Sequence, residues 1–128
     1  MNNIFTVDGK AYNVNITKLT RKASVTDTSN SGRVISGDMV RDIIGTYYNY
    51  TLEIALAGSD VASYDELFDV VTAPEDSHAI TVPYGQETLS FQAYITSAED
   101  SLKIQDGKNM WGFEGMQLNF IAMSPQRR

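Results

Sequence analysis

Residues 46–57 alternate between apolar and polar side chains, and this pattern constrains the fold more than any other feature of the chain. One set of alternating positions is apolar or aromatic and the other is largely polar: Tyr48, Tyr50, Leu52, Ile54 and Leu56 against Tyr47, Asn49, Thr51 and Glu53. A period of two is that of a β-strand with one buried face and one wetter face. A slip of one residue would exchange the two faces, so we expect the register of this strand to be strongly fixed.

Other segments predict antiparallel hairpins. Asp8 and Gly9 separate the apolar residues of 4–7 from alternating residues in 11–16, and an Asp-Gly pair supplies the positive φ angles of a tight turn. Alternating residues in 78–82 and 89–95 flank a second turn at 84–86. The polar residues 97–109 predict a loop.

The last predicted strand covers residues 110–122. Its apolar residues change phase in the middle: Trp111 and Phe113 are at odd positions, whereas Met116, Leu118 and Phe120 are at even ones. Because glycine inside a strand often marks a bulge, the phase shift predicts a β-bulge at Gly115.

One segment, at about 63–73, has helical spacing. Ser63 and Glu66 stand three residues apart, as in a capping box, and apolar residues follow at the spacing of one helix face: Tyr64, Leu67, Phe68 and Val71. Pro74 is expected to end the helix. The acidic residues Asp65, Glu66 and Asp69 are interpreted as a solvated first turn and not as a cation site.

These segments together predict a mainly β fold. It is an antiparallel β-sandwich or a partly open barrel of about six strands with one packed helix. The length of 128 residues corresponds to a single domain, 1–128. Residues 34–45 are compatible with a strand or with a short capped helix, and we favour the strand because short isolated helices are marginal.

Residues 22–45 are polar and punctuated by glycines, and they predict an extended loop. Long connections in compact domains often carry function, so we expect this loop to contact a partner. The candidate interaction residues are small polar residues, one arginine, and the apolar and aromatic residues that follow: Ser29, Asn30, Ser31, Arg33, Met39 and Tyr47.

The net charge of −6 is concentrated in the second half of the chain. Residues 1–64 have six acidic and six basic side chains, whereas residues 65–128 have ten acidic and four basic ones. Acidic surface repels a phosphate backbone, so sequence-specific nucleic-acid binding is not expected. No apolar run approaches the roughly 18 to 20 residues that cross a bilayer, and residues 1–5 lack a secretory signal. We therefore expect a cytoplasmic protein without a membrane partner.

Residues for catalysis or metal binding are scarce. The chain has no cysteine and a single histidine, His78, within a predicted strand. One histidine cannot build a multi-histidine metal site, and no nucleophile in a recognisable context accompanies it. Phosphate-binding glycine motifs are also lacking. We expect no catalytic residue, no metal, no cofactor and no enzyme.

Aromatic residues suggest an alternative function. Seven tyrosines and one tryptophan are present, and exposed rings can stack on sugars or anchor a protein interface. Because Tyr48 and Tyr50 share a face with apolar residues, Tyr47 and Tyr94 are the candidates for exposure. A carbohydrate-binding or protein-binding β-sandwich module is the alternative, with a small enzyme as the less favoured one.

The order of several short motifs resembles a known class of proteins. These motifs are Ser-Gly-Arg at 31–33, Gly-Asp-Met at 37–39, Gly-Thr-Tyr at 45–47, Tyr-Asp-Glu-Leu-Phe at 64–68, Val-Pro-Tyr at 82–84, Trp-Gly-Phe at 111–113 and Leu-Asn-Phe-Ile-Ala at 118–122. With the hairpin that precedes them, they resemble small structural proteins encoded in the tail modules of phages and prophages of Gram-positive bacteria.

The resemblance covers nearly the whole chain, and it implies a β-rich tail or baseplate subunit without catalytic residues. Its partners would be further copies of itself, as a homo-oligomer, and other tail or virion proteins. It would be found in the cytoplasm of the host bacterium during assembly and then in the tail of the virion.

Overall fold

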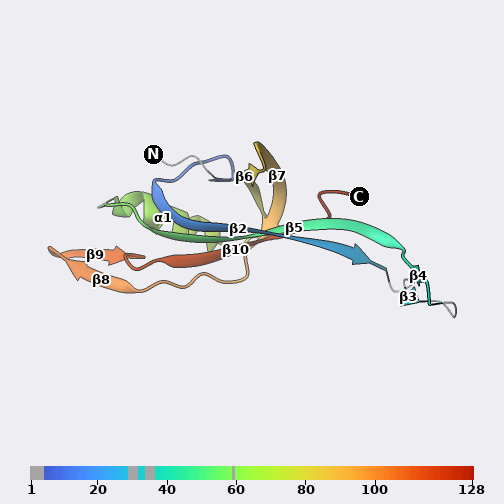
Figure 1. Cartoon of the computed structure of the whole chain (residues 1–128). Helices are drawn as coiled ribbons and strands as arrows, with labels where there is room; N and C mark the ends of the chain where they lie inside the picture. Colours follow the sequence, from blue (N-terminus) through green and yellow to red (C-terminus); the bar gives the residue numbers. More distant parts are fainter. Residues whose placement is uncertain (1–4, 29–31, 34–36, 59) are drawn as a thin grey trace.

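The computed structural model describes residues 5–28, 32–33, 37–58 and 60–128, and these form a strand-rich fold with one helix (Figure 1). The elements follow the chain in this order: β1 Thr6–Val7, β2 Val14–Asp27, β3 Gly32–Arg33, β4 Met39–Val40, β5 Ile43–Leu56, α1 Val61–Val71, β6 His78–Tyr84, β7 Glu87–Tyr94, β8 Leu102–Gln105, β9 Lys108–Trp111 and β10 Met116–Ala122. All recorded strand pairs are antiparallel. The predicted fold class, mainly β with antiparallel strands and one packed helix, is confirmed.

Six of the strands form one sheet, in the order β1-β6-β7-β10-β5-β2. Strand β10 joins its two halves, because residues 116–120 pair with β5 whereas Ile121 and Ala122 pair with β7. In Figure 1, β6 and β7 rise steeply from the plane of β2, β5 and β10. The sheet bends at β10 and does not close into a barrel.

The core lies on the face of β5 that the alternation predicts. Tyr50, Leu52 and Ile54 are at most 2% exposed. Strand β10 adds Leu118 and Phe120 beside them, in register with Leu52 and Tyr50. The opposite face of β5 is only partly buried. Strand β5 therefore has the predicted division between a core face and a wetter face, with its register fixed by partners on both sides.

Helix α1 packs against this core, but its start differs from the prediction. Tyr64, Leu67 and Val71 are buried, as the helical spacing predicts. The predicted cap at Ser63 is wrong: Asp60 is the N-cap, and its Oδ1 atom accepts a hydrogen bond from the backbone N–H of Ser63 at 3.2 Å. Aspartate is as good an N-cap as serine, so the helix begins one turn earlier than predicted.

The first predicted hairpin is also wrong in its pairing. Asp8 and Gly9 have the positive φ angles of a tight turn, 53° and 82°. However, β1 pairs with β6, where Thr6 lies opposite Thr81. After the turn, the chain pairs with β1 only through a single bridge between Val7 and Lys10. The second predicted hairpin, β6–β7, is confirmed.

The predicted loop at 97–109 and the predicted bulge at Gly115 are corrected as well. Residues 102–105 and 108–111 form the separate β8–β9 hairpin. The chain then turns at 112–115, and β10 begins at Met116. The phase shift in the sequence therefore marks a break between two strands and not a bulge within one.

The extended loop predicted at 22–45 is largely strand in the described residues. Strand β2 continues to Asp27, and β5 begins at Ile43. Between them, Gly32 and Arg33 pair with Val40 and Met39. The strand favoured for 34–45 is confirmed at 39–40 and 43–45, whereas residues 34–36 lie outside the described residues.

We expect Gly112→Ala to destabilise the fold more than Gly107→Ala. Both glycines have positive φ, 74° and 75°, but a Cβ at Gly112 would meet the Tyr64 ring at 2.1 Å, whereas at Gly107 nothing lies within 4 Å. Gly107→Ala should cost about 1–2 kcal/mol of backbone strain. Gly112→Ala should cost about 1–3 kcal/mol more from overpacking. Urea unfolding of both variants measures the two losses in free energy of unfolding. Equal losses would show that the Tyr64 ring does not restrict the space beside Gly112.

Candidate functional site

Strands β2 and β5 extend beyond the rest of the sheet as a two-stranded arm. They pair from Val14 opposite Leu56 to Asp27 opposite Ile43, whereas β10 pairs with β5 only as far as Tyr50. We call the described residues within 22–49 the β-arm; β3 and β4 lie at its far end (Figure 1). Seven strand residues at roughly 3.3 Å each give it a length of about 20 Å. The β-arm is thus continuous with the core strand β5.

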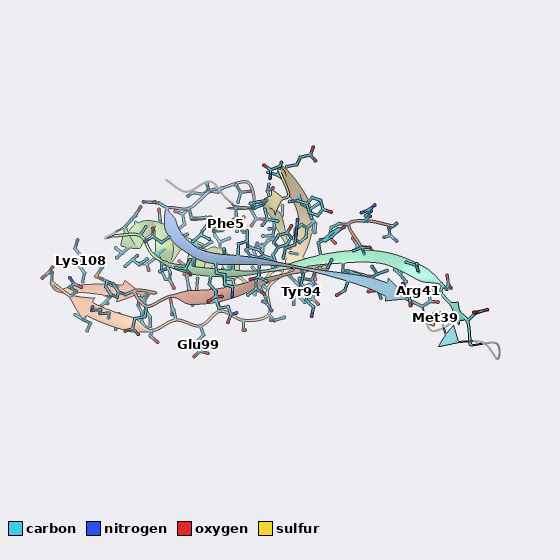
Figure 2. The ribbon with its side chains drawn as sticks, in the orientation of Figure 1. Phe5, Met39, Arg41, Tyr94, Glu99 and Lys108 are labelled. Atoms are coloured by element: carbon cyan, nitrogen blue, oxygen red, sulfur yellow. The ribbon has the colours of Figure 1, made fainter. Side chains whose placement is uncertain are left out.

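The β-arm exposes apolar side chains. Val25, Met39 and Ile43 are 51%, 46% and 52% exposed, and Ile44 is 37% exposed. Figure 2 shows Met39 near the tip, far from the body of the molecule. A group of exposed apolar residues on one projecting element is typical of a protein interaction site.

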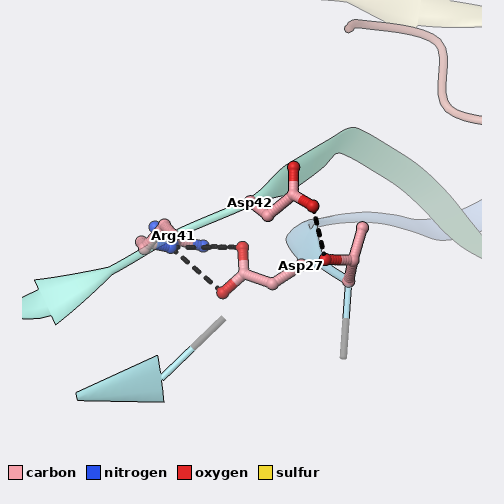
Figure 3. Close-up of polar contacts among 4 residues, drawn as sticks. Asp27, Arg41 and Asp42 are labelled. Atoms are coloured by element: carbon pink, nitrogen blue, oxygen red, sulfur yellow. Dashed lines mark hydrogen bonds and ion pairs between the residues drawn. The ribbon is translucent and has the colours of Figure 1, made fainter. Parts of the chain in front are cut away.

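Polar contacts link the two strands near the tip of the β-arm (Figure 3). Arg41 donates to both carboxylate oxygens of Asp27, with the shortest contact, Nη2 to Oδ1, at 2.7 Å. The hydrogen bonds to Asp27 and the negative charge of its carboxylate raise the pKa of Arg41. Thr28 donates through its hydroxyl to Asp42 at 2.8 Å and through its backbone N–H to the Asp42 carbonyl. These contacts tie the chain together where the regular ladder ends.

The C-terminal segment covers the root of the β-arm on its other edge. The backbone N–H of Thr46 donates to the Arg127 carbonyl at 2.6 Å. The side chain of Gln126 accepts a hydrogen bond from the backbone N–H of Tyr48 at 2.9 Å. It donates another to the Tyr48 carbonyl at 2.7 Å. Tyr84 donates its hydroxyl to that of Tyr48, and the two rings meet edge to face at 5.1 Å. The root is therefore held from two sides, and the apolar residues lie beyond it.

The candidate interaction residues predicted from the sequence lie on or near the β-arm, as far as they are described. Ser29, Asn30 and Ser31 lie outside the described residues. Arg33 belongs to β3 and pairs through its backbone with Met39.

Tyr47, the remaining predicted interaction residue, is half-buried opposite Ser24. Sequence reasoning missed Val25, Ile43 and Ile44. Their β-branched side chains at both ends of a polar stretch were the available signal.

A pocket lies at the other end of the molecule, between α1 and β9. It has a volume of about 430 Å³ and is lined by aromatic and acidic side chains: Tyr64, Asp65, Phe68, Asp69, Asp100 and Trp111. In Figure 1, α1 and β9 lie opposite the tip with β3 and β4. Asp65, Phe68 and Asp69 share one helix face by their spacing, but Trp111 comes from a distant strand. Sequence reasoning therefore interpreted the carboxylates as a solvated first turn and missed the pocket.

Tyr64 fixes one carboxylate at this pocket, which we call the acidic aromatic pocket. Its buried hydroxyl donates to Asp100 Oδ2 at 2.7 Å and contacts the Met116 sulfur at 3.4 Å. Burial and the hydrogen bond to Asp100 raise the pKa of Tyr64 far above its usual value. Tyr64 is therefore a permanent donor, and it holds Asp100 in place. A perturbed group in a pocket marks a candidate binding site.

Charge is divided between the two ends. Residues 57–126, which include the pocket, have eleven acidic and two basic side chains, a net charge of −9. Residues 14–56, which form β2, the β-arm and β5, have four acidic and five basic ones. The C-terminal Arg127 and Arg128 lie beside the root of the β-arm. The chain is therefore acidic at the pocket end and close to neutral along the β-arm.

His78 is buried and is held by two carboxylates. Its Nδ1 atom lies 2.8 Å from Asp8 Oδ2 and 3.6 Å from Glu75 Oε2. The other Asp8 oxygen accepts the backbone N–H of Ala79. The three ligand atoms lie within 4.8 Å of one another, close enough for one cation. Because Asp8 and His78 already satisfy each other, their contact is a hydrogen bond that ties the 8–9 turn to β6.

The comparisons with known proteins do not identify the chain. No family model matches it, and no curated protein is a significant match. Within the described residues, no helix is both long and apolar enough to span a membrane.

We expect Asp8→Asn to lower stability in a pH-dependent way. The hydrogen bond from His78 lowers the pKa of Asp8 below its usual 3.8. A lowered pKa in the folded state stabilises the protein above the unfolded pKa, and this contribution is lost as the pH falls through the folded value. The difference in free energy of unfolding between wild type and Asp8→Asn should be full at pH 5 and shrink below about pH 4.

Urea unfolding from pH 5 to pH 2.5 measures this difference. Asp76→Asn is the matched control, because Asp76 is an exposed neighbour for which the described part of the chain shows no ion pair. A difference for Asp8→Asn that does not change with pH would contradict the lowered pKa of Asp8 and its hydrogen bond with His78.

Proposed function

We propose that the protein is a non-catalytic structural subunit of a phage or prophage tail module. In this function it binds further copies of itself or neighbouring tail subunits through the β-arm. The observation that carries the proposal is the β-arm, which projects from the sheet and exposes Val25, Met39 and Ile43. The motif resemblance supplies the biological setting, in the cytoplasm of the host and then in the virion.

The free edge of β2 supports an assembly function. Strand β2 is the last strand of the sheet, so along its 14 residues the outer edge has no strand partner within the described residues. Unpaired N–H and C=O groups on an edge can accept a strand from another chain. Lys18 and Lys22 stand along this edge, and lysine on an edge strand disfavours indiscriminate pairing. The edge is thus suited to a selected partner.

The difference between the two ends of the molecule also supports assembly. The exposed apolar residues of the β-arm, such as Val25 and Ile43, lie at the opposite end of the molecule from the acidic pocket. A contact between unlike ends of two copies is heterologous, and such contacts generate rings when the rotation closes and filaments when it does not. Rings and stacks of rings are the kind of assembly that a tail subunit requires.

A carbohydrate-binding module is the second candidate. The acidic aromatic pocket favours it, because Trp111 and Phe68 offer rings and the aspartates offer hydrogen-bond acceptors. Glycan-array binding that is lost in Trp111→Ala would favour this function over assembly.

We expect the triple variant Val25→Thr, Ile43→Thr and Ile44→Thr to lose self-association or binding to the neighbouring subunit. Threonine keeps the β-branched shape that strands favour but removes apolar surface. Multi-angle light scattering over a concentration series measures the mass of wild type and variant. The apparent association constant should fall at least tenfold, and circular dichroism should remain unchanged.

The matched control is Ile104→Thr, which alters an exposed isoleucine on β8 at the opposite end of the molecule. This variant should associate as wild type does. Unchanged association of the triple variant would contradict the proposal that the protein associates through the β-arm. Equal losses in the triple variant and in Ile104→Thr would show that general hydrophobicity, and not the β-arm, drives association.

A further inference from the structure

We infer that residues 124–128 form a strap that covers the outer edge of β5, and that a strand from a second copy of the chain must displace this strap to pair there. The inference rests on the proposed assembly function and adds an autoinhibitory contact to it. The β-arm has two edges, of which the β2 edge is open and the β5 edge is covered at its root. The strap therefore limits strand pairing at the second edge.

The strap lies on an edge that β10 leaves open. Strand β10 pairs with β5 only as far as Tyr50, and from there to Ile43 the strand partner of β5 is β2 on the other side. The strap lies beside β5 (Figure 1), where the backbone N–H of Thr46 donates to the Arg127 carbonyl at 2.6 Å. The N–H of Arg127 donates back to the Thr46 carbonyl at 3.4 Å. These two bonds are those of an antiparallel strand pair.

Gln126 takes the place of a second paired residue through its side chain. Its amide oxygen accepts the backbone N–H of Tyr48 at 2.9 Å, and its amide nitrogen donates to the Tyr48 carbonyl at 2.7 Å. Thr46 and Tyr48 are two residues apart, so their main-chain groups point to the same edge of β5. The strap thus occupies the donors and acceptors that a neighbouring strand would use.

Gly45 provides the space in which the strap lies. A Cβ at this position would be 2.5 Å from the Arg127 carbonyl oxygen and 2.9 Å from the Pro125 Cβ. Because non-bonded carbon atoms prefer separations of about 3.5–4.0 Å, a side chain here would force the strap away from β5. The contact therefore depends on a particular residue of β5 and is part of the folded state.

The strap is displaceable, because few contacts other than hydrogen bonds hold it. Its residues are exposed or half-buried, and none of them belongs to the buried core. Besides the bonds above, the Arg127 side chain contacts the Tyr48 hydroxyl, and Pro125 has no N–H for a further strand bond. A partner strand would replace these main-chain hydrogen bonds at little net cost. It would also bury Ile44, which follows on the same edge and is 37% exposed.

A second copy of the chain offers a suitable strand. Within the described residues no strand pairs with the outer edge of β2, so this edge can pair with another chain. A neighbour in the same orientation would place its β2 antiparallel to β5, because the two strands are antiparallel within one copy. The contact joins two different edges and is therefore heterologous, like the contact in the proposed assembly.

A reversible disulfide tests the strap directly, because the chain has no cysteine of its own. The variant Thr46→Cys, Arg127→Cys places two cysteines opposite each other in an antiparallel pair. The Cα atoms of such a pair are about 5.5 Å apart, a separation that a disulfide spans. Oxidation at low protein concentration locks the strap within one chain, and reduction frees it. Light scattering over a concentration series compares the two forms of the same variant.

The reduced form should associate about tenfold or more strongly than the oxidised form, because only the free strap can leave the edge. In the otherwise unchanged chain, Gln126→Ala should also strengthen association, because the main chain of Tyr48 loses both partners. Amide exchange of Tyr48 should become faster in the monomer of this variant. Gln105→Ala is the matched control, since it removes an exposed glutamine from β8 at the opposite end, and it should associate as wild type does.

Equal association of the oxidised and reduced forms would overturn the inference and leave the proposed assembly function standing. Association of Gln126→Ala that does not exceed that of wild type, with unchanged circular dichroism, would overturn it too. The assembly function is judged separately, by the association of the variant altered at Val25, Ile43 and Ile44. If no form associates, the reduced one included, the strap is not what limits assembly, and the inference fails together with self-association.

Discussion

The structure depends on the pairing of strand β5 on both sides. Its buried face, with Tyr50, Leu52 and Ile54, forms the centre of the core, while β2 and β10 fix its register. Because a slip of one residue would expose this face, the register of the strand is strongly specified. The β-arm is the continuation of the same strand, and its orientation is therefore set by the core. A projecting element that is anchored in this way loses less conformational entropy on binding than a flexible loop does.

The two ends of the molecule have different chemistry, and this difference would give the proposed assembly a direction. The β-arm carries exposed apolar residues such as Val25 and Ile43, whereas the opposite end has a cluster of aspartates around Trp111. Apolar burial supplies most of the free energy in such contacts, and charge pairing selects the partner and the register. The net charge of −9 in residues 57–126 also disfavours contact between two pocket ends. In the proposed assembly, contact between unlike ends is therefore favoured.

Local patterns in the sequence were sufficient for the core face of β5, the buried face of α1 and the β6–β7 hairpin. The pairing of β1 with β6 depends on residues more than seventy positions apart, which no local pattern encodes. Residues 22–27 lack apolar alternation, because their order comes from pairing with β5 and not from their own burial. The pocket combines Asp65 and Asp69 on one helix face with the distant Trp111, so only the aspartates were visible in the sequence.

The central claim is that the β-arm meets a partner, and its amide hydrogens report this contact directly. The measurement is hydrogen exchange of wild type at increasing protein concentration, resolved for residues 22–27 and 43–49. The account predicts that exchange in these two segments slows as the concentration rises, while amides of the β6–β7 hairpin do not change. Exchange in the β-arm that is independent of concentration, in a sample where light scattering shows association, would contradict it.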